Sequence, residues 1–198
     1  MAGLMSIDIQ DNITRFRNDM QDIFADRLKV KMHVQDLMEE HPGENALTIF
    51  LTSGVFTEAD TCPQKEEASD NAGKKGLLVG KSRDFQRFLN KEGPSYDGQF
   101  MLDLEINYDS GTCTIHNINL PLQLRNLGVG GLILEKTEKM AGRLGMTMIY
   151  APSEHRATSF WLKNGYQFYF AGEKTFYEKN ANKPNLYVAY DLRKKIAP

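Results

Sequence analysis

The N-terminal part of the chain carries apolar side chains at helical spacing. Between residues 11 and 40, apolar positions recur every three or four residues, which is typical of an amphipathic helix that packs on one face. The pattern stops at the His-Pro-Gly sequence of residues 41–43, because proline and glycine end a helix. We therefore predict one or two N-terminal helices within residues 1–45.

Alternation between apolar and polar positions begins after this point. Residues 46–56 are rich in β-branched and aromatic side chains and predict a strand. Residues 100–108 and 112–120 also have the composition and alternation of strands, and the Asp-Ser-Gly sequence at 109–111 is a turn signal between them. These two segments therefore predict a β-hairpin with a short loop.

Helical spacing returns directly after the closely spaced glycines of residues 128–131. The amphipathic run that follows is predicted to end at Gly145, a helix stop signal. Residues 146–151 then predict a short strand. We expect this strand to lie parallel to the strand at 112–120, with the helix as a right-handed crossover between them.

One more helix and two more strands complete the predicted elements. Ser153 is placed to cap a helix that runs to about residue 164, and Gly165 is its stop signal. The last two strands and the polar connector between them are predicted at residues 166–170, 185–192 and 171–184.

The order of these elements predicts an α/β (α+β) fold with a mixed central sheet and helices on both faces. The length of 198 residues suits a single domain over residues 1–198. We expect residues 100–192 to form its core. Residues 57–76 are polar and charged and predict a flexible insertion, which is followed by a short helix at 82–93.

Composition excludes several functional classes. The net charge of −2 argues against a general surface for nucleic acid, and no apolar run reaches the length of a membrane span. The only cysteines, Cys62 and Cys113, do not form a disulfide framework, so we expect a reducing, cytoplasmic setting. The histidines and cysteines lack metal-ligand spacing, so no metal site is predicted.

The glycines at 128–131 need an explanation, because glycine destabilises the start of a helix. One interpretation is an anion site, since the first N–H groups of a helix lack partners and the helix dipole is positive there; Arg125 would add charge. The other is a tight turn whose glycines allow close packing of helix on sheet. The pattern alone leaves both open.

Two familiar phosphate-binding loops fit poorly. The Walker type needs Gly-Lys-Ser/Thr at the end of its loop, and no such sequence follows Gly131. The dinucleotide type needs a third glycine where Ile133 stands, and an acidic residue at the end of the next strand, which instead ends in Tyr-Ala-Pro at 150–152.

A third pattern matches better. Residues 125–130, Arg-Asn-Leu-Gly-Val-Gly, match the Arg/Gln-x-x-Gly-x-Gly/Ala signature of the GNAT N-acetyltransferase superfamily. As in that family, they follow a predicted strand and open a long helix. Residues 157–168 resemble the second signature of the family, an alanine, an aromatic pair and a Gly-aromatic sequence that leads into a strand. The resemblance spans about residues 100–170.

The resemblance implies a binding site for acetyl-coenzyme A. The diphosphate would rest on backbone N–H groups of the glycine loop, and the pantetheine arm would run along the end of the preceding strand, where an N–H near Leu120 would polarise the thioester while an amine attacks. Ser159 could hydrogen-bond the sulfur, and Trp161 is a packing residue or a wall for the cofactor. The implied cofactor-binding residues are Asn119, Leu120, Arg125, Asn126, Leu127, Gly128, Val129, Gly130, Gly131, Ser159 and Trp161.

The chain departs from the family at the expected catalytic positions. Many members carry a glutamate base where Thr114 stands, and a tyrosine acid where Trp161 stands. His116 shares the sheet face of Thr114 and has a suitable pKa, while Glu105 on the neighbouring strand is a second candidate base. The alternatives are a hydrogen-bonded strand histidine and a solvated glutamate. A thiol nucleophile at Cys113 competes with the simpler interpretation of a buried structural cysteine.

These observations predict an enzyme that moves acetyl from acetyl-coenzyme A to a primary amine of a small molecule, a lysine or a protein N-terminus. The N-terminal helices and the insertion at 57–76 would shape the acceptor site. The missing glutamate and tyrosine favour an alternative, a non-catalytic member that binds a partner protein with or without coenzyme A. An unrelated nucleotide-binding domain is a third interpretation. A homodimer and a longer acyl group are left open.

Overall fold

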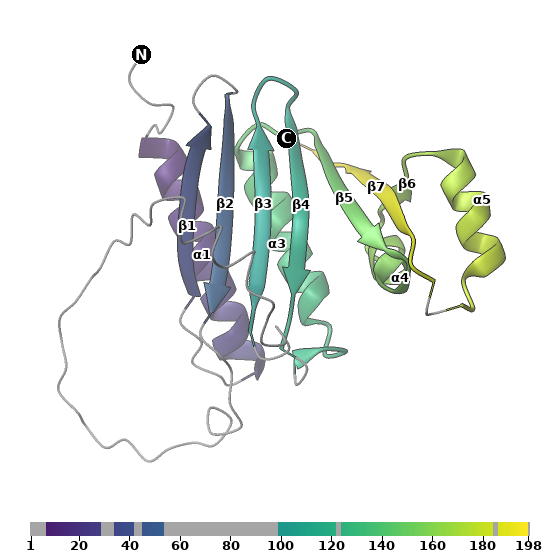
Figure 1. Cartoon of the computed structure of the whole chain (residues 1–198). Coiled ribbons are helices and arrows are strands. Elements are labelled where there is room, and N and C mark those ends of the chain that lie inside the picture. Colours follow the sequence, from purple (N-terminus) through teal and green to yellow (C-terminus); the bar gives the residue numbers. More distant parts are fainter. Residues whose placement is uncertain are drawn as a thin grey trace.

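The computed structural model describes residues 7–28, 34–41, 45–53, 99–121, 124–183 and 186–197. Seven strands form one mixed sheet in the order β1-β2-β3-β4-β5-β7-β6 (Figure 1). The predicted mixed α/β class is therefore confirmed. The elements are α1 (Ile7–Leu28), β1 (Val34–His41), β2 (Ala46–Ser53), β3 (Met101–Asn107), β4 (Thr112–Asn119), α3 (Val129–Arg143), β5 (Met148–Glu154), α4 (His155–Lys163), β6 (Gln167–Phe168), α5 (Ala171–Asn180) and β7 (Ala189–Lys195).

The sheet changes from antiparallel to parallel at its centre. Strands β1 to β4 pair in sequence order and are all antiparallel, and the β3–β4 pair is the predicted hairpin. Strand β5 pairs parallel with β4, and α3 connects the two, as predicted. Strand β7 lies between β5 and β6 and is antiparallel to both.

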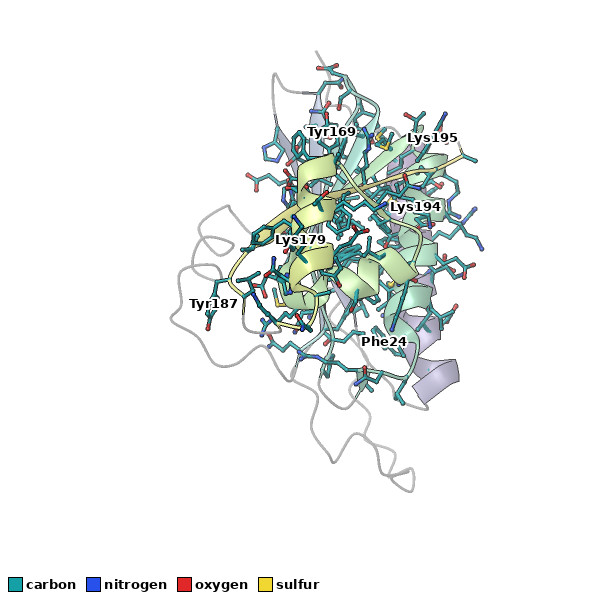
Figure 2. All side chains as sticks on the ribbon, turned by 90° about the vertical axis from the view of Figure 1, so that its right-hand side faces the viewer. Phe24, Tyr169, Lys179, Tyr187, Lys194 and Lys195 are labelled. Carbon is teal, nitrogen blue, oxygen red and sulfur yellow. The ribbon has the colours of Figure 1, made fainter. Side chains whose placement is uncertain are left out.

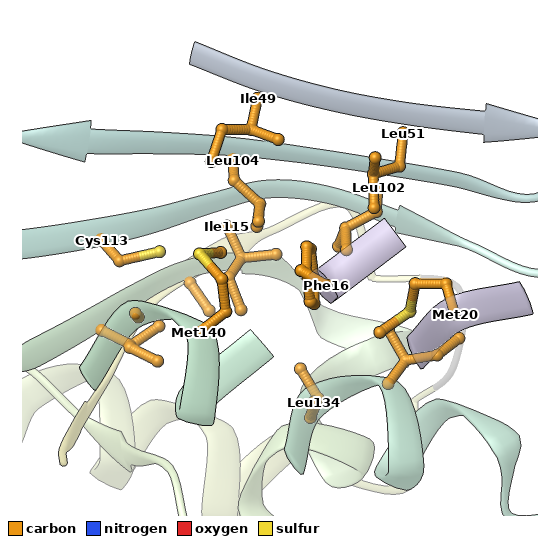
Figure 3. Close-up of a cluster of buried hydrophobic side chains, with 14 of the residues drawn as sticks. Phe16, Met20, Ile49, Leu51, Leu102, Leu104, Cys113, Ile115, Leu134 and Met140 are labelled. Carbon is orange, nitrogen blue, oxygen red and sulfur yellow. The ribbon is translucent and has the colours of Figure 1, made fainter. Parts of the chain in front are cut away.

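Helices α1 and α3 lie side by side on one face of the sheet (Figure 1). Phe16 and Met20 of α1 and Leu134 and Met140 of α3 point toward the apolar residues of the strands (Figure 3). Burying each such side chain stabilises the fold by roughly 1.5–3 kcal/mol. The strand side chains that meet them include Ile49, Leu51, Leu102, Leu104, Cys113 and Ile115.

The prediction of helix for the whole of residues 11–40 is wrong in its second half. Residues 34–41 form β1, which pairs with β2 over its full length, from Val34 opposite Ser53 to His41 opposite Ala46. Apolar residues 37 and 38 are adjacent, a spacing that suits neither period cleanly. Pairing with a strong neighbouring strand decided the structure, because tertiary contacts override weak local preference.

The C-terminal third also differs from its prediction. The supposed polar connector at 171–184 contains helix α5, which buries none of its residues and therefore shows no apolar stripe in the sequence. Strand β7 begins at residue 189 rather than 185.

Ser153 does not cap α4 as predicted. It lies in β5, where its hydroxyl donates to the carbonyl oxygen of Glu154. The N-cap of α4 is Glu154, which makes no capping hydrogen bond with its side chain.

Other predictions lie outside the described residues, namely the insertion at 57–76, the helix at 82–93 and Cys62. Among the described helices, α1 and α3 cover one face of β1–β4, while α4 packs against β5 and β7 and α5 contacts β6. None of these helices is long and apolar enough to span a membrane.

Candidate functional site

The parallel pair at the centre of the sheet separates after three residues. Strands β4 and β5 pair from Thr112 opposite Met148 to Thr114 opposite Tyr150, and no further. Beyond this point β4 continues to residue 119 and β5 to residue 154, and the two diverge (Figure 1). We call this point the fork. Past the fork, the edge of β4 that faces β5 has no ladder partner in β5.

A bulge in β4 accounts for the divergence. Leu104 of β3 lies opposite Ile115, but the next pair joins Asp103 to Asn117, so that His116 is an extra residue in β4. A bulge bends its strand and increases the local twist. Because it comes directly after the last β4–β5 pair, it turns β4 away from β5.

The turn that follows β4 leads into an uncapped helix. Gly128 is the N-cap of α3 and has a φ angle of 78°, and Asn126 also has a positive φ of 63°. Within the described part of the chain, no side chain caps this helix, and its first turn contains no acidic residue. Among the described residues, no side chain therefore competes with an anion for the first N–H groups and the positive end of the helix dipole.

The three glycines have different roles. A Cβ on Gly128 would have no atom within 4 Å, so only its left-handed backbone requires glycine. A Cβ on Gly130 would lie 2.9 Å from Cε2 of Phe160, and one on Gly131 would lie 3.2 Å from Oδ1 of Asn164. Close packing therefore explains Gly130 and Gly131, although they pack against α4 and its C-cap rather than against the sheet as predicted, while the anion site at the turn stays a prediction.

Arg125 ties the turn to the end of β4. Its Nε donates to the carbonyl oxygen of Leu120 at 2.8 Å, and its Nη2 donates to Oδ1 of Asn119 at 3.0 Å. Asn119 in turn donates to the carbonyl oxygen of Gln99 at 2.8 Å. These bonds fix the distance between the edge of β4 and the start of α3, and they hold the guanidinium beside both.

The two predicted catalytic residues lie together beside the fork. Nε2 of His116 is 3.1 Å from Oε2 of Glu105, and about two-fifths of each side chain is exposed. The prediction treated them as separate candidates, whereas the fold pairs them. Their proximity follows from the pairing of β3 with β4, because Glu105 lies opposite Thr114, only two residues before His116.

Asp103 is the third residue of this cluster and its second carboxylate, and the sequence prediction missed it. Its Oδ1 is buried and has no hydrogen-bond partner within the described residues. Burial raises the pKa of the Asp103 carboxyl; His116 lowers it and Glu105 raises it by smaller amounts. The sequence spacing could have indicated this residue. Residues two apart in a strand share a face, and Asp103 precedes Glu105 by two.

The remaining predicted site residues lie on α4 or in the core. Ser159 is exposed on α4, whereas Trp161 is 4% exposed and its ring contacts those of Phe160 and Tyr166. Burial raises the pKa of Tyr166 far above its ordinary value, which makes this hydroxyl a poor proton donor. Burial raises the pKa of Cys113 to about 12, so its thiol is a structural group and not a nucleophile.

No family model and no curated protein matches this chain. Solved structures do match it. A Lactobacillus plantarum protein described as an N-acetyltransferase is 19% identical with a TM-score of 0.39, over 50% of this chain and 62% of that one. A Bacillus anthracis protein described as a streptothricin acetyltransferase, solved with acetyl-coenzyme A, is 20% identical with a TM-score of 0.37, over 49% and 56%.

An acetyltransferase of the GNAT family from Streptococcus pneumoniae is 17% identical with a TM-score of 0.39, over 61% of this chain and 79% of that one. The matched region thus spans less than two thirds of the first two relatives. All three proteins are described as acetyltransferases, the class that the motif predicted, and likenesses at 17–20% identity with TM-scores of 0.37–0.39 concern the fold alone. Likenesses of this degree assign neither a substrate nor a catalytic residue.

Proposed function

We propose that this protein transfers an acetyl group from acetyl-coenzyme A to a primary amine. The observation that carries the proposal is the fork between β4 and β5, beside which the uncapped start of α3 lies. Among the described residues, the edge of β4 past the fork pairs with no residue of β5, which suits an extended amide-containing arm, and no side chain caps α3, which suits a diphosphate. The sequence of the turn supports the same assignment, because it matches the GNAT signature at residues 125–130.

The residues present fit this cofactor. Backbone N–H groups of residues 126–131 would hold the diphosphate, with no acidic side chain in the first turn to repel it. The edge of β4 at Asn119 and Leu120 would bind the pantetheine arm, and exposed Ser159 would approach it from α4. Trp161 would act indirectly, by supporting Phe160 and the helix from behind. The thioester, when bound, supplies the activated acetyl group.

The cluster of Asp103, Glu105 and His116 would handle the proton of the acceptor amine. The imidazole of His116 accepts that proton as a general base, and Glu105 orients the ring through the contact of 3.1 Å. Burial raises the pKa of the nearby Asp103 carboxyl, and His116 lowers it by a smaller amount. This arrangement would replace the glutamate that is absent at Thr114.

Cofactor binding can be tested separately from catalysis. Isothermal titration of the full chain with acetyl-coenzyme A should give saturable binding, and Gly128→Ala should weaken it at least about fivefold by straining the turn. Gly172→Ala is the matched control, because Gly172 lies in α5 with open space around it. Absence of binding in the unaltered protein would end the proposal.

Catalysis is tested with a panel of amines and the release of free coenzyme A. His116→Ala should lower kcat by roughly 100-fold or more, as for the loss of a general base, while the affinity for acetyl-coenzyme A stays unchanged. The conservative change Glu105→Gln should have a smaller effect on kcat. Binding of acetyl-coenzyme A without transfer to any amine or peptide would favour the alternative, a GNAT-fold protein that engages a partner.

A further inference from the structure

A pocket of about 250 Å³ opens beside the fork, and the proposed chemistry does not use it. Three aromatic rings dominate its lining, and a single carboxylate is the only charged group there. The lining residues are Tyr150, Ala151, Pro152, Tyr169, Phe170, Asp191 and Leu192. A whole ligand site usually measures about 300–1,000 Å³, so this pocket is sized for one end of a small molecule.

The pocket shares a sheet face with the catalytic cluster. Tyr150 lies opposite Thr114 in the last β4–β5 pair, and Thr114 lies opposite Glu105 in β3. Directly opposed residues point to the same face, so one row runs across the sheet from Glu105 to Tyr150. A molecule whose reacting group lies at the fork can therefore extend past Tyr150 into the pocket.

The exposure of its aromatic rings indicates that the pocket serves a ligand. Tyr169 is 41% exposed and Phe170 is 51% exposed, although their ring centroids are only 4.6 Å apart. Tyr150 contacts Tyr169 at 5.9 Å on the other side. Large aromatic side chains that gather at a surface hollow mark a binding site more often than single exposed ones do.

The carboxylate of Asp191 is the feature of the pocket that favours a cation. Among the described residues, no side chain pairs with the carboxylate of Asp191, whose backbone N–H is instead held by the carboxylate of Glu173 at 3.3 Å. Glu173 is not part of the pocket lining, so the carboxylate of Asp191 is the one charge among the residues that the structure places there.

The guanidinium of Arg193, directly opposite Tyr150 in the β5–β7 pair, lies 4.7 Å from the ring centroid of Tyr169 and already occupies one face of that ring. The side of the pocket formed by Asp191 and Phe170 is therefore the one left for a ligand cation.

We propose that this pocket binds a small organic cation, an ammonium with apolar substituents. The aromatic faces of Tyr169 and Phe170 would contact the substituents, and the carboxylate of Asp191 would balance the charge. The identity of the acceptor rests on the proposed acetyl transfer: the amine that receives the acetyl group would be a compact diamine. One of its nitrogens is acetylated at the fork, and the other is held by Asp191.

The binding test avoids acetyl transfer altogether. Benzyltrimethylammonium has no N–H bond and cannot be acetylated, so its titration into the full chain without coenzyme A reports on the pocket alone. It should bind at least about tenfold more tightly than phenylacetate or benzyl alcohol. Asp191→Asn should weaken it about fivefold, and Phe170→Leu about threefold. Equal binding of phenylacetate, or an unchanged affinity in Asp191→Asn, would overturn the cation site.

Matched controls separate the pocket from general surface effects. Tyr187 is a fully exposed aromatic residue that lies well away from Tyr169 (Figure 2), so Tyr187→Leu should leave the affinity for benzyltrimethylammonium unchanged. Glu178→Gln removes an exposed carboxylate of α5 and should do the same. Circular dichroism checks that each variant is folded.

A kinetic test addresses the acceptor. The protein should acetylate 1,4-bis(aminomethyl)benzene with a KM at least about fivefold below that of 4-methylbenzylamine, and Asp191→Asn should abolish this difference while kcat changes little. A preference that survives Asp191→Asn would refute the role in the acceptor. If acetyl-coenzyme A fails to bind while benzyltrimethylammonium still binds, the cation site stands and the transferase proposal falls.

Discussion

Replacing Gly130 with alanine would test how α3 and α4 meet at the candidate site. The new methyl carbon would lie 2.9 Å from Cε2 and 3.1 Å from Cζ of Phe160, and 3.8 Å from Cδ1 of Leu120. Carbon atoms in contact normally lie at least about 3.5 Å apart, so the ring of Phe160 must move. Phe160 packs against the core, and its ring contacts Trp161, which resists that movement.

The expected magnitude follows from two opposed effects. Overpacking costs about 1–3 kcal/mol, while alanine is favoured over glycine inside a helix by about 0.5–1 kcal/mol. Gly130→Ala should therefore lower the free energy of unfolding by about 1 kcal/mol, which shifts Tm by roughly 2–4 °C in a chain of this size. Gly172→Ala, in open space on α5, should leave stability unchanged or raise it slightly.

Urea unfolding measures the effect, with the fluorescence of Trp161, the single tryptophan of the chain, as one probe and circular dichroism as the other. Phe160→Leu shortens the side chain that collides with the new methyl group. The double variant should therefore cost at least about 0.5 kcal/mol less than the sum of the single variants. A Gly130→Ala protein as stable as the original, or additive effects in the double variant, would refute the assigned contact.

Three further predictions concern groups in and around the core. Burial raises the pKa of Asp103, so the folded state keeps a proton that the unfolded state has lost, and stability falls as the pH rises between the two pKa values. In urea titrations, Asp103→Asn should therefore be more stable than the original protein at pH 7, and this difference should disappear below about pH 4. Because burial raises the pKa of Cys113 to about 12, a variant in which the other cysteine is serine should react with a thiol reagent only after unfolding, and rapid native labelling would contradict this. The ammonium of Lys194 donates to both carboxylate oxygens of Glu138 at 2.8 Å; Lys194→Met should cost about 1–2 kcal/mol of unfolding free energy, against at most about 0.5 kcal/mol for Lys139→Met on the exposed surface.

The sequence pattern identified the elements whose apolar positions recur regularly and whose ends carry clear turn or stop residues. The hairpin of β3 and β4 was predictable because apolar and polar residues alternate on either side of an Asp-Ser-Gly turn. The start and end of α3 were predictable from its glycines, of which Gly128 and Gly145 both have positive φ angles. Strand β1 and helix α5 were not predictable, because one depends on its neighbour in the sheet and the other buries no residue.

The candidate site divides in the same way. The sequence alone placed a glycine turn before a helix and matched it to a family signature, since backbone conformation at glycine is a local property. It also named His116 and Glu105, but as unrelated candidates. Whether two strands separate, and where, depends on pairing between residues distant in the chain, which local pattern does not record.

The amino-acid sequence by itself determined the order of most elements, the open turn at Gly128 and the chemistry available on each strand. Only the tertiary structure decided that β5 and β4 stop pairing after Tyr150, that the ring of Phe160 packs against Gly130, and that Asp191 lines an aromatic pocket. The physical reason is the separation along the chain over which each kind of interaction acts. Dihedral preferences act within a few residues, whereas a fork and a pocket arise from contacts between segments that approach each other only when the core has packed.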